Sequence, residues 1–392
     1  MSCADSFALG SGLDRASANG PTRFARDSAI APPLVESARV LITGITGFAG
    51  SHLAEYILAE HPDVAIFGTY RWRSRMENLD TLMAKGVLDV IEGRYSSGAG
   101  QADQARKGRV TLLHCELTDA GATEKLIAAT RPDRIFHLAA QSFVQSSFDE
   151  PSATMRINIE AQLNVLEAIR RHDTKIRVHI AGSSEEYGLV YPDEVPMKET
   201  NPLRPLSPYA VSKVAQDKLA YQYFKSYGLH LVTTRGFNHT GPRRGTHFVT
   251  STIARQIALI EAGQHEPVIY HGDLTSKRDW TDVRDMVRAY WLALERGEAG
   301  EVYNVGRGRT WAIGEMLSMQ LANSTVKIRS QEDPARLRPS DVPILWADAS
   351  KFQKATGWEP KIPFEQTLRD LLDYWRDRVR RDTVRIGAVL NA

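Results

Sequence analysis

The chain has few cysteines, no long apolar run and almost no net charge, and each scarcity excludes a class of protein. It holds only Cys3 and Cys115, and Cys3 lies in a segment without a folded pattern, which excludes a disulfide framework and favours a reducing cytoplasm. No apolar run approaches the ~20 residues that cross a bilayer, and no secretory signal opens the chain, so we expect a soluble protein. Lys and Arg number 49 and Asp and Glu 47, a balance that argues against nucleic acid or a membrane as partner.

The sequence contains instead a regular alternation of short apolar runs and longer amphipathic stretches from residue 38 onward. The runs are VLIT, VAIFGTY, VTLLHCEL, RIFHLAA, VHIAGSS and LHLVTTRGF. Strands and helices that alternate at this spacing form a parallel sheet covered by helices on both faces. The prediction is an α/β protein, with a Rossmann-type doubly wound parallel sheet and a smaller C-terminal substrate-binding lobe.

Domain boundaries are placed where this alternation begins, becomes irregular and ends. The first segment lacks apolar periodicity, and a polar, glycine-containing stretch, RYSSGAGQADQARKGR, is typical of an exposed loop. The run EVYNVG is expected to return to the sheet. The predicted parts are a disordered tail at 1–37, a cofactor domain at 38–241 with a return at about 267–306, an exposed loop at 94–109, a lobe at 242–266 and 307–380, and a tail at 381–392.

A glycine-rich loop, GITGFAG, follows the first apolar run directly and precedes a helical pattern from about Ser51. Its Gly44, Gly47 and Gly50 are spaced as GxxGxxG. Glycines allow the backbone to turn tightly and approach a pyrophosphate, while the first turn of the next helix offers free amide donors and a partial positive charge. The loop therefore predicts a dinucleotide site.

The second apolar run ends about where a ribose-binding acid is expected, roughly 20 residues beyond the glycines. The residues there are Tyr70, Arg71, Trp72 and Arg73, with no Asp or Glu. Two guanidinium groups can hold a 2'-phosphate by charge-assisted hydrogen bonds, so NADP is favoured over NAD. The alternative interpretation is a solvated loop in which these arginines bind nothing.

A tyrosine and a lysine four residues apart follow a helix-start signal. Ser207 is suited to the N-cap and Pro208 to the first helical position, so Tyr209 and Lys213 share one helix face. A tyrosine is a poor base at neutral pH until a nearby ammonium group stabilises its phenolate, which Lys213 can do. The run VHIAGSS ends in serines at 183 and 184, where a hydroxyl can hold the substrate oxygen. These residues together predict a Ser-Tyr-Lys catalytic triad.

In this order and spacing, GITGFAG, HLAAQS, GSSEEYG and SPYAVSK resemble the extended short-chain dehydrogenase/reductase family of nucleotide-sugar enzymes. The segments FNHTGPRRGTHFVT, KRDWTDVRD and RLRPSDVP resemble the subgroup that acts on GDP-mannose and its 4-keto product. The resemblance implies 4,6-dehydration of GDP-mannose through bound NADP as the first expectation. The alternatives are NAD(P)H-dependent reduction of the 4-keto-6-deoxy sugar and another nucleotide-sugar epimerase or dehydratase activity. The resemblance also implies that the protein forms a homodimer or homotetramer.

The resemblance implies a role for each matching residue, and no metal. The catalytic residues are Ser183, Glu185, Tyr209 and Lys213, with Glu185 as the carboxylate that acts on the sugar ring. The cofactor contacts are Gly44, Gly47, Phe48, Gly50, Arg71, Arg73, Glu116, Leu117, Leu138, Ala139, Ala140, Tyr209 and Lys213. The substrate contacts are Gln141, Ser142, Asn238, Val249, Arg278 and Arg338.

Two positions depart from the dehydratase pattern. Dehydratases usually carry Thr where Ser183 stands, and basic residues where this chain has Ser251 and Thr252. GSSEEYG and RLRPSDVP are reductase-like, whereas PRRG is dehydratase-like.

Several polar residues are expected to be structural. His137, His179 and His239 lack metal-ligand spacing. Glu186 is expected to point away from Glu185 if the backbone there is extended. Asn158 and Asn164 lie in a predicted helix, where capping, packing or subunit contact are alternatives to function.

Overall fold

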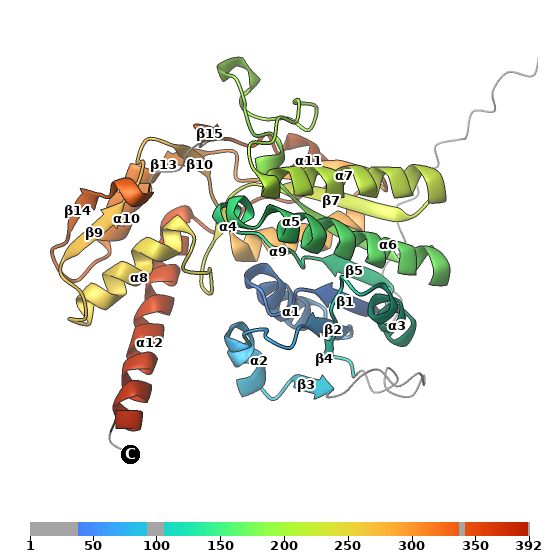
Figure 1. The fold of residues 1–392 in the computed structure, drawn as a ribbon, viewed down its shortest axis with the longest axis horizontal. Helices are drawn as coiled ribbons and strands as arrows, with labels where there is room; N and C mark the ends of the chain where they lie inside the picture. Colours follow the sequence, from blue (N-terminus) through green and yellow to red (C-terminus); the bar gives the residue numbers. More distant parts are fainter. Residues whose placement is uncertain (1–37, 92–105, 337–341, 391–392) are drawn as a thin grey trace, which may run out of the picture. The chain divides into compact units, whose positions relative to one another are not determined.

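The computed structural model describes residues 38–91, 106–336 and 342–390. The predicted tail at 1–37 and most of the predicted loop at 94–109 lie outside these residues. Within them, eight parallel strands form one sheet (Figure 1). In spatial order they are β12 (Val302–Val305), β7 (His230–Gly236), β6 (Arg177–Ser183), β5 (Arg134–His137), β1 (Arg39–Thr43), β2 (Ala65–Tyr70), β4 (Val110–His114) and β3 (Leu88–Ile91).

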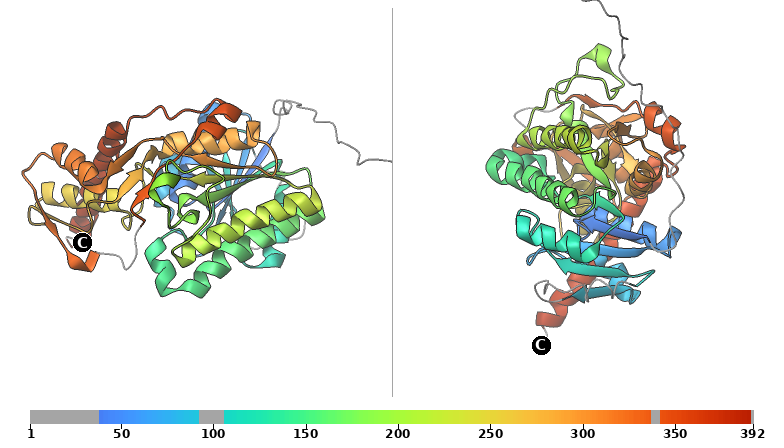
Figure 2. Two further views of the ribbon diagram at one scale, coloured as in Figure 1. Left: turned by 90° about the horizontal axis from the view of Figure 1, so that it is seen from above. Right: turned by 90° about the vertical axis from the view of Figure 1, so that its right-hand side faces the viewer.

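Helices cover both faces of this sheet, as the side view in Figure 2 shows. One face packs against α1 (Phe48–Glu60), α2 (Asp80–Ala84), α9 (Val283–Arg296) and α11 (Ser350–Thr356). The other packs against α3 (Ala120–Thr130), α6 (Ala161–His172) and α7 (Pro208–Tyr227). The central strands are apolar on both sides because both sides are buried. This confirms the predicted α/β, Rossmann-type doubly wound sheet.

The strand order reverses between β1 and β5, which lie next to each other although β2, β3 and β4 intervene in sequence. In open α/β sheets a ligand binds outside the carboxyl ends of the strands at such a reversal. Thr43, the last residue of β1, joins the two strands there. Its hydroxyl oxygen accepts from the amides of Leu138 and Ala139, which follow β5, at 3.1 and 3.2 Å.

A second group of elements packs around its own apolar core, formed by α8 (Val249–Glu261), α10 (Ile313–Ala322) and α12 (Phe364–Leu390). Trp280 and Phe364 stack in this core with ring centroids 5.0 Å apart. The short strands here pair as β9 (Val268–His271) with β14 (Arg329–Glu332), β10 (Lys277–Asp279) with β13 (Thr310–Ala312) and β15 (Ile344–Leu345), and β8 (His239–Thr240) with β11 (Thr281–Asp282).

Short helical segments complete the described chain. They are α4 (Val144–Asp149), α5 (Pro151–Met155), a π-helical turn (Arg156–Glu160) and the 3-10 turns η1 (Glu77–Leu79), η4 (Ser184–Glu186), η5 (Pro192–Glu194) and η6 (Pro334–Arg336). No helix within the described residues is both long and apolar enough to span a bilayer.

Three features differ from the sequence-based expectation. The edge strand β3, with sequence LDVI, was not predicted, because it is half exposed and carries no distinct apolar run. Helix α1 begins at Phe48 rather than about Ser51, so the last glycine of the loop is already helical. Helix α12 continues to Leu390, through most of the segment assigned to a tail from residue 381.

Candidate active site

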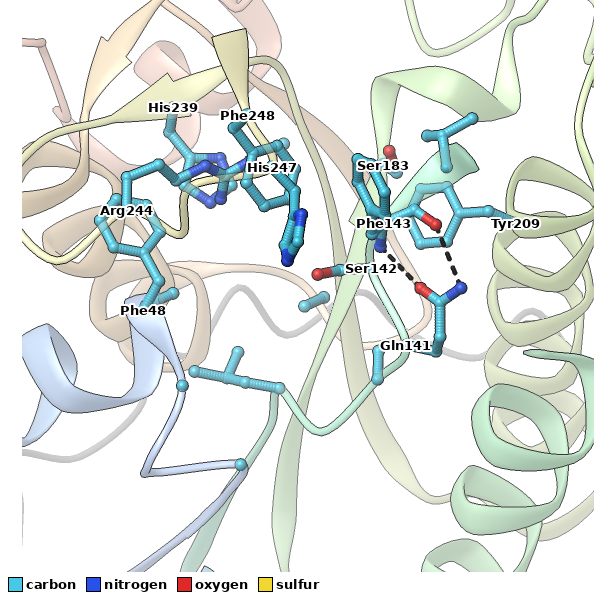
Figure 3. A pocket seen from close by; sticks show the side chains of 18 of the residues that line it. Phe48, Gln141, Ser142, Phe143, Ser183, Tyr209, His239, Arg244, His247 and Phe248 are labelled. Carbon is cyan, nitrogen blue, oxygen red and sulfur yellow. Dashed lines mark hydrogen bonds between the residues drawn. The ribbon is translucent and has the colours of Figure 1, made fainter. Parts of the chain in front are cut away.

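A cavity of about 880 Å³ opens at the carboxyl ends of the strands, where the strand order reverses. It extends from the loop between β1 and α1, past the ends of β5 and β6, to α8 and β9. Figure 3 shows its two sides: Ser183, Tyr209 and Gln141 lie on one, and Phe48, His239, Arg244 and Phe248 on the other. The fold thus brings most of the sequence-predicted site residues to one cavity.

The glycine loop has the geometry that a dinucleotide requires. Gly44 has a φ of +72°, and a Cβ there would lie 2.9 Å from the backbone of Ala139. A Cβ on Gly50 would lie 2.4 Å from the carbonyl oxygen of Gly44. Helix α1 starts after Gly47 with no side-chain cap and no acidic residue in its first turn, so its first amides face the cavity with their partial positive charge. The loop therefore fits a pyrophosphate.

The two candidate arginines that follow β2 differ in their position relative to the cavity. Tyr70 and Arg71 line the cavity, whereas Arg73 is not among its lining residues. Trp72 between them is 87% exposed. The remaining predicted cofactor contacts, which are Phe48, Glu116, Leu117, Leu138, Ala139 and Ala140, all line the cavity.

The predicted helix start at the beginning of SPYAVSK is confirmed in detail. The Ser207 hydroxyl oxygen accepts from the amide of Ala210 at 3.1 Å, and Pro208 occupies the first turn of α7. The Nζ of Lys213 lies 5.8 Å from the centre of the Tyr209 ring and donates to the carbonyl oxygen of Ala181 at 2.8 Å. Both side chains are buried and line the cavity beside Ser183. The structure thus assembles the three triad residues from β6 and α7.

Burial dominates the charge states of this triad. It raises the pKa of Tyr209 to about 12, against an opposing effect of the hydrogen bond with Ser183. It lowers the pKa of Lys213 to about 8, and the carboxylate of Glu186 opposes that shift. The phenol is therefore held protonated at neutral pH, and its use as a base requires additional positive charge nearby.

The two adjacent glutamates after β6 lie in one 3-10 turn. Glu185 lines the cavity, whereas Glu186 is fully buried on the other side of the turn. The expectation that the two point in different directions is met, but the extended backbone assumed for it was wrong. The Ser183 hydroxyl oxygen accepts from the amide of Glu185 at 3.2 Å and so caps this turn.

Gln141 and Ser142 follow β5 and line the cavity. The amide of Gln141 donates to Oδ1 of Asn158 at 2.8 Å, and the Gln141 side chain is hydrogen bonded to the backbone of Phe143 (Figure 3). Asn158 also donates to the Ser212 hydroxyl at 2.8 Å, and Asn164 donates to the carbonyl oxygen of Leu117 at 2.9 Å. Both asparagines therefore hold cavity-lining segments in place from within the protein.

The remaining predicted substrate contacts divide into two groups. Asn238, Val249 and Arg278 line the cavity. Arg338 lies outside the described residues. At the position where dehydratases carry basic residues, Thr252 lines the cavity, but Ser251 is buried and its hydroxyl donates to the carbonyl oxygen of Arg244 at 2.6 Å.

The three histidines that were expected to be structural each have a hydrogen-bond or ring partner. His137 and His179 are buried in the sheet, hydrogen bonded to Thr43 and Thr234 at 3.0 and 2.8 Å. Burial lowers the pKa of each to about 3. His239 lines the cavity and stacks on Phe48 with ring centroids 5.8 Å apart.

Among the cavity residues that sequence reasoning missed are Arg244 and Tyr290. The guanidinium of Arg244 lies 3.4 Å from the ring centre of Phe248 and 4.9 Å from that of Phe48, and within the described chain it makes no ion pair. Tyr290 reaches the cavity from α9. The motif PRRG was a usable signal for Arg244, but nothing in the sequence places α9 beneath the catalytic residues.

A parallel sheet with a glycine loop, a Ser-Tyr-Lys triad and a cavity across the strand ends defines a nucleotide-sugar enzyme of the extended short-chain dehydrogenase/reductase class. A family model described as GDP-mannose 4,6 dehydratase matches residues 41–371, so the chain belongs to the GDP-mannose 4,6 dehydratase family.

Relatives with two names are similar to the chain over most of its length. GDP-mannose 4,6 dehydratase 2 of Arabidopsis thaliana is 32% identical over 95% of this chain and 97% of its own. GDP-6-deoxy-D-mannose reductase of Pseudomonas aeruginosa is 30% identical over 88% of this chain and 99% of its own. The solved structure of RMD from Pseudomonas aeruginosa complexed with NADPH superposes with a TM-score of 0.72, at 29% identity, over 87% of this chain and 99% of that one.

Proposed function

We propose that the chain is a GDP-mannose 4,6-dehydratase that uses bound NADP. The observation that supports this proposal is the position of Glu185, which lines the cavity together with Ser183 and Tyr209. A hydroxyl oxidation at the sugar C4 needs only the tyrosine, lysine and serine. A carboxylate beside them supplies the second base that loss of water requires.

The chain's own residues divide the proposed reaction between them. Tyr209 takes the proton from the C4 hydroxyl, Ser183 holds that oxygen, and the Lys213 ammonium favours the phenolate. The C4 ketone makes the C5 hydrogen acidic, and Glu185 removes this proton and passes it to the C6 hydroxyl, which leaves as water. The glycine loop, Tyr209 and Lys213 would hold a nicotinamide cofactor, which would supply a hydride acceptor for C4, a hydride donor for C6 and a positive charge that opposes the effect of burial on Tyr209.

The choice of NADP rests on Arg71. It lines the cavity at the end of β2, where the chain offers no carboxylate to a ribose diol. A guanidinium in that place suits a 2'-phosphate.

We assign the nucleotide-sugar end of the cavity to Asn238, Val249 and Arg278, because these residues line it beyond the triad. Gln141 and Ser142 lie between them and the strand ends and are proposed to contact the sugar. Guanine as the base is proposed from the family alone.

A second candidate function is reduction of a 4-keto-6-deoxy GDP-sugar by NADPH. Two observations favour this reaction. Ser183 stands where dehydratases usually carry threonine, and the chain is similar to the Pseudomonas reductase. A reductase takes the cofactor as a consumed substrate and uses Tyr209 as an acid, so the same triad serves both reactions.

We also propose a homo-oligomer formed through α6 and α7, which lie side by side in Figures 1 and 2. Large apolar side chains are exposed on both helices, among them Leu163 on α6 and Val211 and Tyr221 on α7. Sedimentation of the wild type and of Val211→Glu tests the proposal. The variant should sediment as a smaller species than the wild type, and identical sedimentation profiles of the two proteins would contradict this interface.

The decisive experiment is mass spectrometry of the purified protein with GDP-mannose, with and without added NADPH. A dehydratase removes one water from GDP-mannose without consuming added cofactor. A reductase leaves GDP-mannose intact and oxidises NADPH only when a 4-keto-6-deoxy GDP-sugar is present. Tyr209→Phe is the matched control, because any product that it still forms at the wild-type rate does not come from this site.

A further inference from the structure

A buried cluster of charges lies directly behind the catalytic turn. Glu186 is 0% exposed, and its two carboxylate oxygens have separate partners. Oε1 accepts from the amide of Ser183 at 2.8 Å, and Oε2 accepts from Nε of Arg235 at 3.1 Å. One carboxylate therefore joins the backbone of a triad residue to a buried cation on the neighbouring strand β7.

Arg235 is held by several partners and offers a rigid support. It donates to Asp217 at 2.5 Å, to the Tyr187 hydroxyl at 3.1 Å and to the carbonyl oxygen of Glu199 at 3.1 Å. Its side chain is only 2% exposed. Buried ion pairs are often no more stabilising than apolar side chains of similar size, so burial of three charges here calls for a reason other than stability.

Lys213 of the proposed triad binds the strand that leads into this turn. Lys213 donates to the carbonyl oxygen of Ala181, two residues before Ser183, and Asp217 lies one helical turn farther along α7. The carboxylate of Glu186 raises the pKa of Lys213 against the lowering effect of burial. Burial, followed by the nearby Asp217, raises the pKa of Glu186 itself, whereas both of its oxygens accept hydrogen bonds, one of them from the Arg235 guanidinium, as those of an ionised carboxylate do. The charge of the lysine thus depends on its buried neighbour.

We propose that Glu186 is a positioning residue for the proposed reaction: it fixes the backbone at Ser183 so that Glu185 faces the cavity, and it supplies the negative charge that balances the Lys213 ammonium. This inference rests on the proposed function only in taking Ser183, Tyr209 and Lys213 as the reacting group. It holds equally for the dehydratase and the reductase.

Asp217 provides a matched control within the same cluster. It pairs with the same guanidinium and is nearly as buried, but it does not bond to Ser183 and does not line the cavity. If the cluster only stabilises the fold, Glu186→Gln and Asp217→Asn have the same consequences. If Glu186 positions the catalytic group, only Glu186→Gln moves the alkaline fall of activity and of NADPH binding to lower pH.

The experiment measures kcat and, without any sugar, the Kd for NADPH between pH 6 and 10. The charged groups around Glu186 are Arg235 on β7 and Asp217 and Lys213 on α7. Glutamine keeps an oxygen for the Ser183 amide but no charge, so Lys213 loses its proton at lower pH. We expect the alkaline fall of kcat and of the affinity for NADPH to move down by about one pH unit, since one nearby opposite charge shifts a pKa by roughly 1–3 units. At pH 8, kcat should fall about fivefold, because the protonated fraction of a group with a pKa of about 8 drops by that factor when its pKa falls by one unit.

Asp217→Asn should leave the alkaline fall in place or move it upward, because Asp217 raises the pKa of Glu186 and its removal leaves Glu186 more fully charged. Glu186→Asp keeps the charge but is one methylene shorter, so it should keep the wild-type pH profile with a lower kcat. It also tests the proposal if Glu186→Gln does not fold.

Wild-type profiles in Glu186→Gln, or an equal downward shift in Asp217→Asn, would overturn the proposal. A wild-type kcat in Glu186→Asp would overturn its positioning half. If the wild type converts neither GDP-sugar but binds NADPH with an alkaline fall that Glu186→Gln moves down, the proposed function fails and the role of Glu186 stands.

Discussion

The two sides of the cavity are built on different principles. On the catalytic side, comprising residues 183–186 and α7, neighbours in sequence are fixed by local geometry: a helix spacing of four aligns Tyr209 with Lys213, and Ser207 caps that helix. On the loop side, residues 241–248, the decisive contacts join residues far apart. The guanidinium of Arg243 binds Glu55 of α1 at 2.9 and 2.7 Å, and Arg244 lies against Phe48.

This difference teaches that two adjacent arginines can have opposite roles. Arg243 is paired, with a φ of +71°, a conformation that non-glycine residues rarely adopt and that surrounding contacts must maintain. Arg244 is unpaired within the described chain and faces the cavity. The first holds the loop on α1, and as a result the second reaches the cavity.

The largest expected effect lies on the catalytic side. Tyr209→Phe removes the hydroxyl that exchanges a proton with the sugar, and turnover should fall by about 10⁴-fold, the upper range for general acid-base catalysis. Cofactor affinity should stay within about twofold, because the ring remains buried and packed. Initial rates and calorimetric titration of NADPH measure the two. Retained turnover would remove Tyr209 from the mechanism.

The next effect separates two steps on that same side. Glu185→Gln preserves size but removes the base for the C5 proton, so dehydration should slow by at least about 10²-fold. Given GDP-mannose, the variant should still reduce its cofactor and then stop, with nicotinamide absorbance but no deuterium uptake at C5. Dehydration at nearly the wild-type rate would contradict the role of Glu185 and leave Tyr209 and Lys213 unaffected.

Much of the fold could be predicted because buried parallel strands are short apolar runs. The runs at β1, β2 and β4 to β7 were recognisable in this way, whereas β3 was not, since an edge strand with half-exposed side chains needs fewer apolar residues. Strand order is a long-range property. The reversal between β1 and β5 follows from the family fold rather than from any residue pattern in the strands.

The site could be predicted where a motif is a continuous local structure. The glycine loop and the YxxxK pair carry their geometry within a few residues. Arg244 and Tyr290 could not be assigned. The position of Arg244 depends on the pairing of its neighbour Arg243 with Glu55, which is 188 residues away in sequence. The position of Tyr290 depends on the packing of α9 against the sheet. Glu186 was misjudged in its backbone, since a 3-10 turn begins right at the strand end.

The loop side is tested by Arg243→Ala, which removes two bonds to Glu55, one to the carbonyl oxygen of Asn78 and two to the ring of His52. With the loop released from α1, Arg244 loses its fixed place, and KM for the GDP-sugar should rise about tenfold, equivalent to about 1.4 kcal/mol. We expect kcat to change by less than about threefold, because the triad is held by other elements.

Arg204→Ala is the control for this variant. Arg204 makes a similar two-bond pair with Glu194, at 2.8 and 2.7 Å, but does not line the cavity. Equal rises in KM for the two variants would show that the loop contact has no special role.

The last prediction compares the two arginines after β2, which the sequence could not distinguish. Arg71 lines the cavity and Arg73 does not, with the exposed Trp72 between them. The wild type should bind NADP at least about tenfold more tightly than NAD, since one charge-assisted contact with the 2'-phosphate contributes roughly 1.5–3 kcal/mol. Arg71→Ala should abolish most of this preference by weakening NADP alone, whereas Arg73→Ala should change it by less than about threefold, because a solvated guanidinium acts through water and is screened by salt. Calorimetric Kd values for both cofactors at two salt concentrations decide the matter: equal affinities in the wild type contradict NADP as the cofactor, and a larger loss in Arg73→Ala would show that the loop at 71–73 rearranges when the cofactor binds.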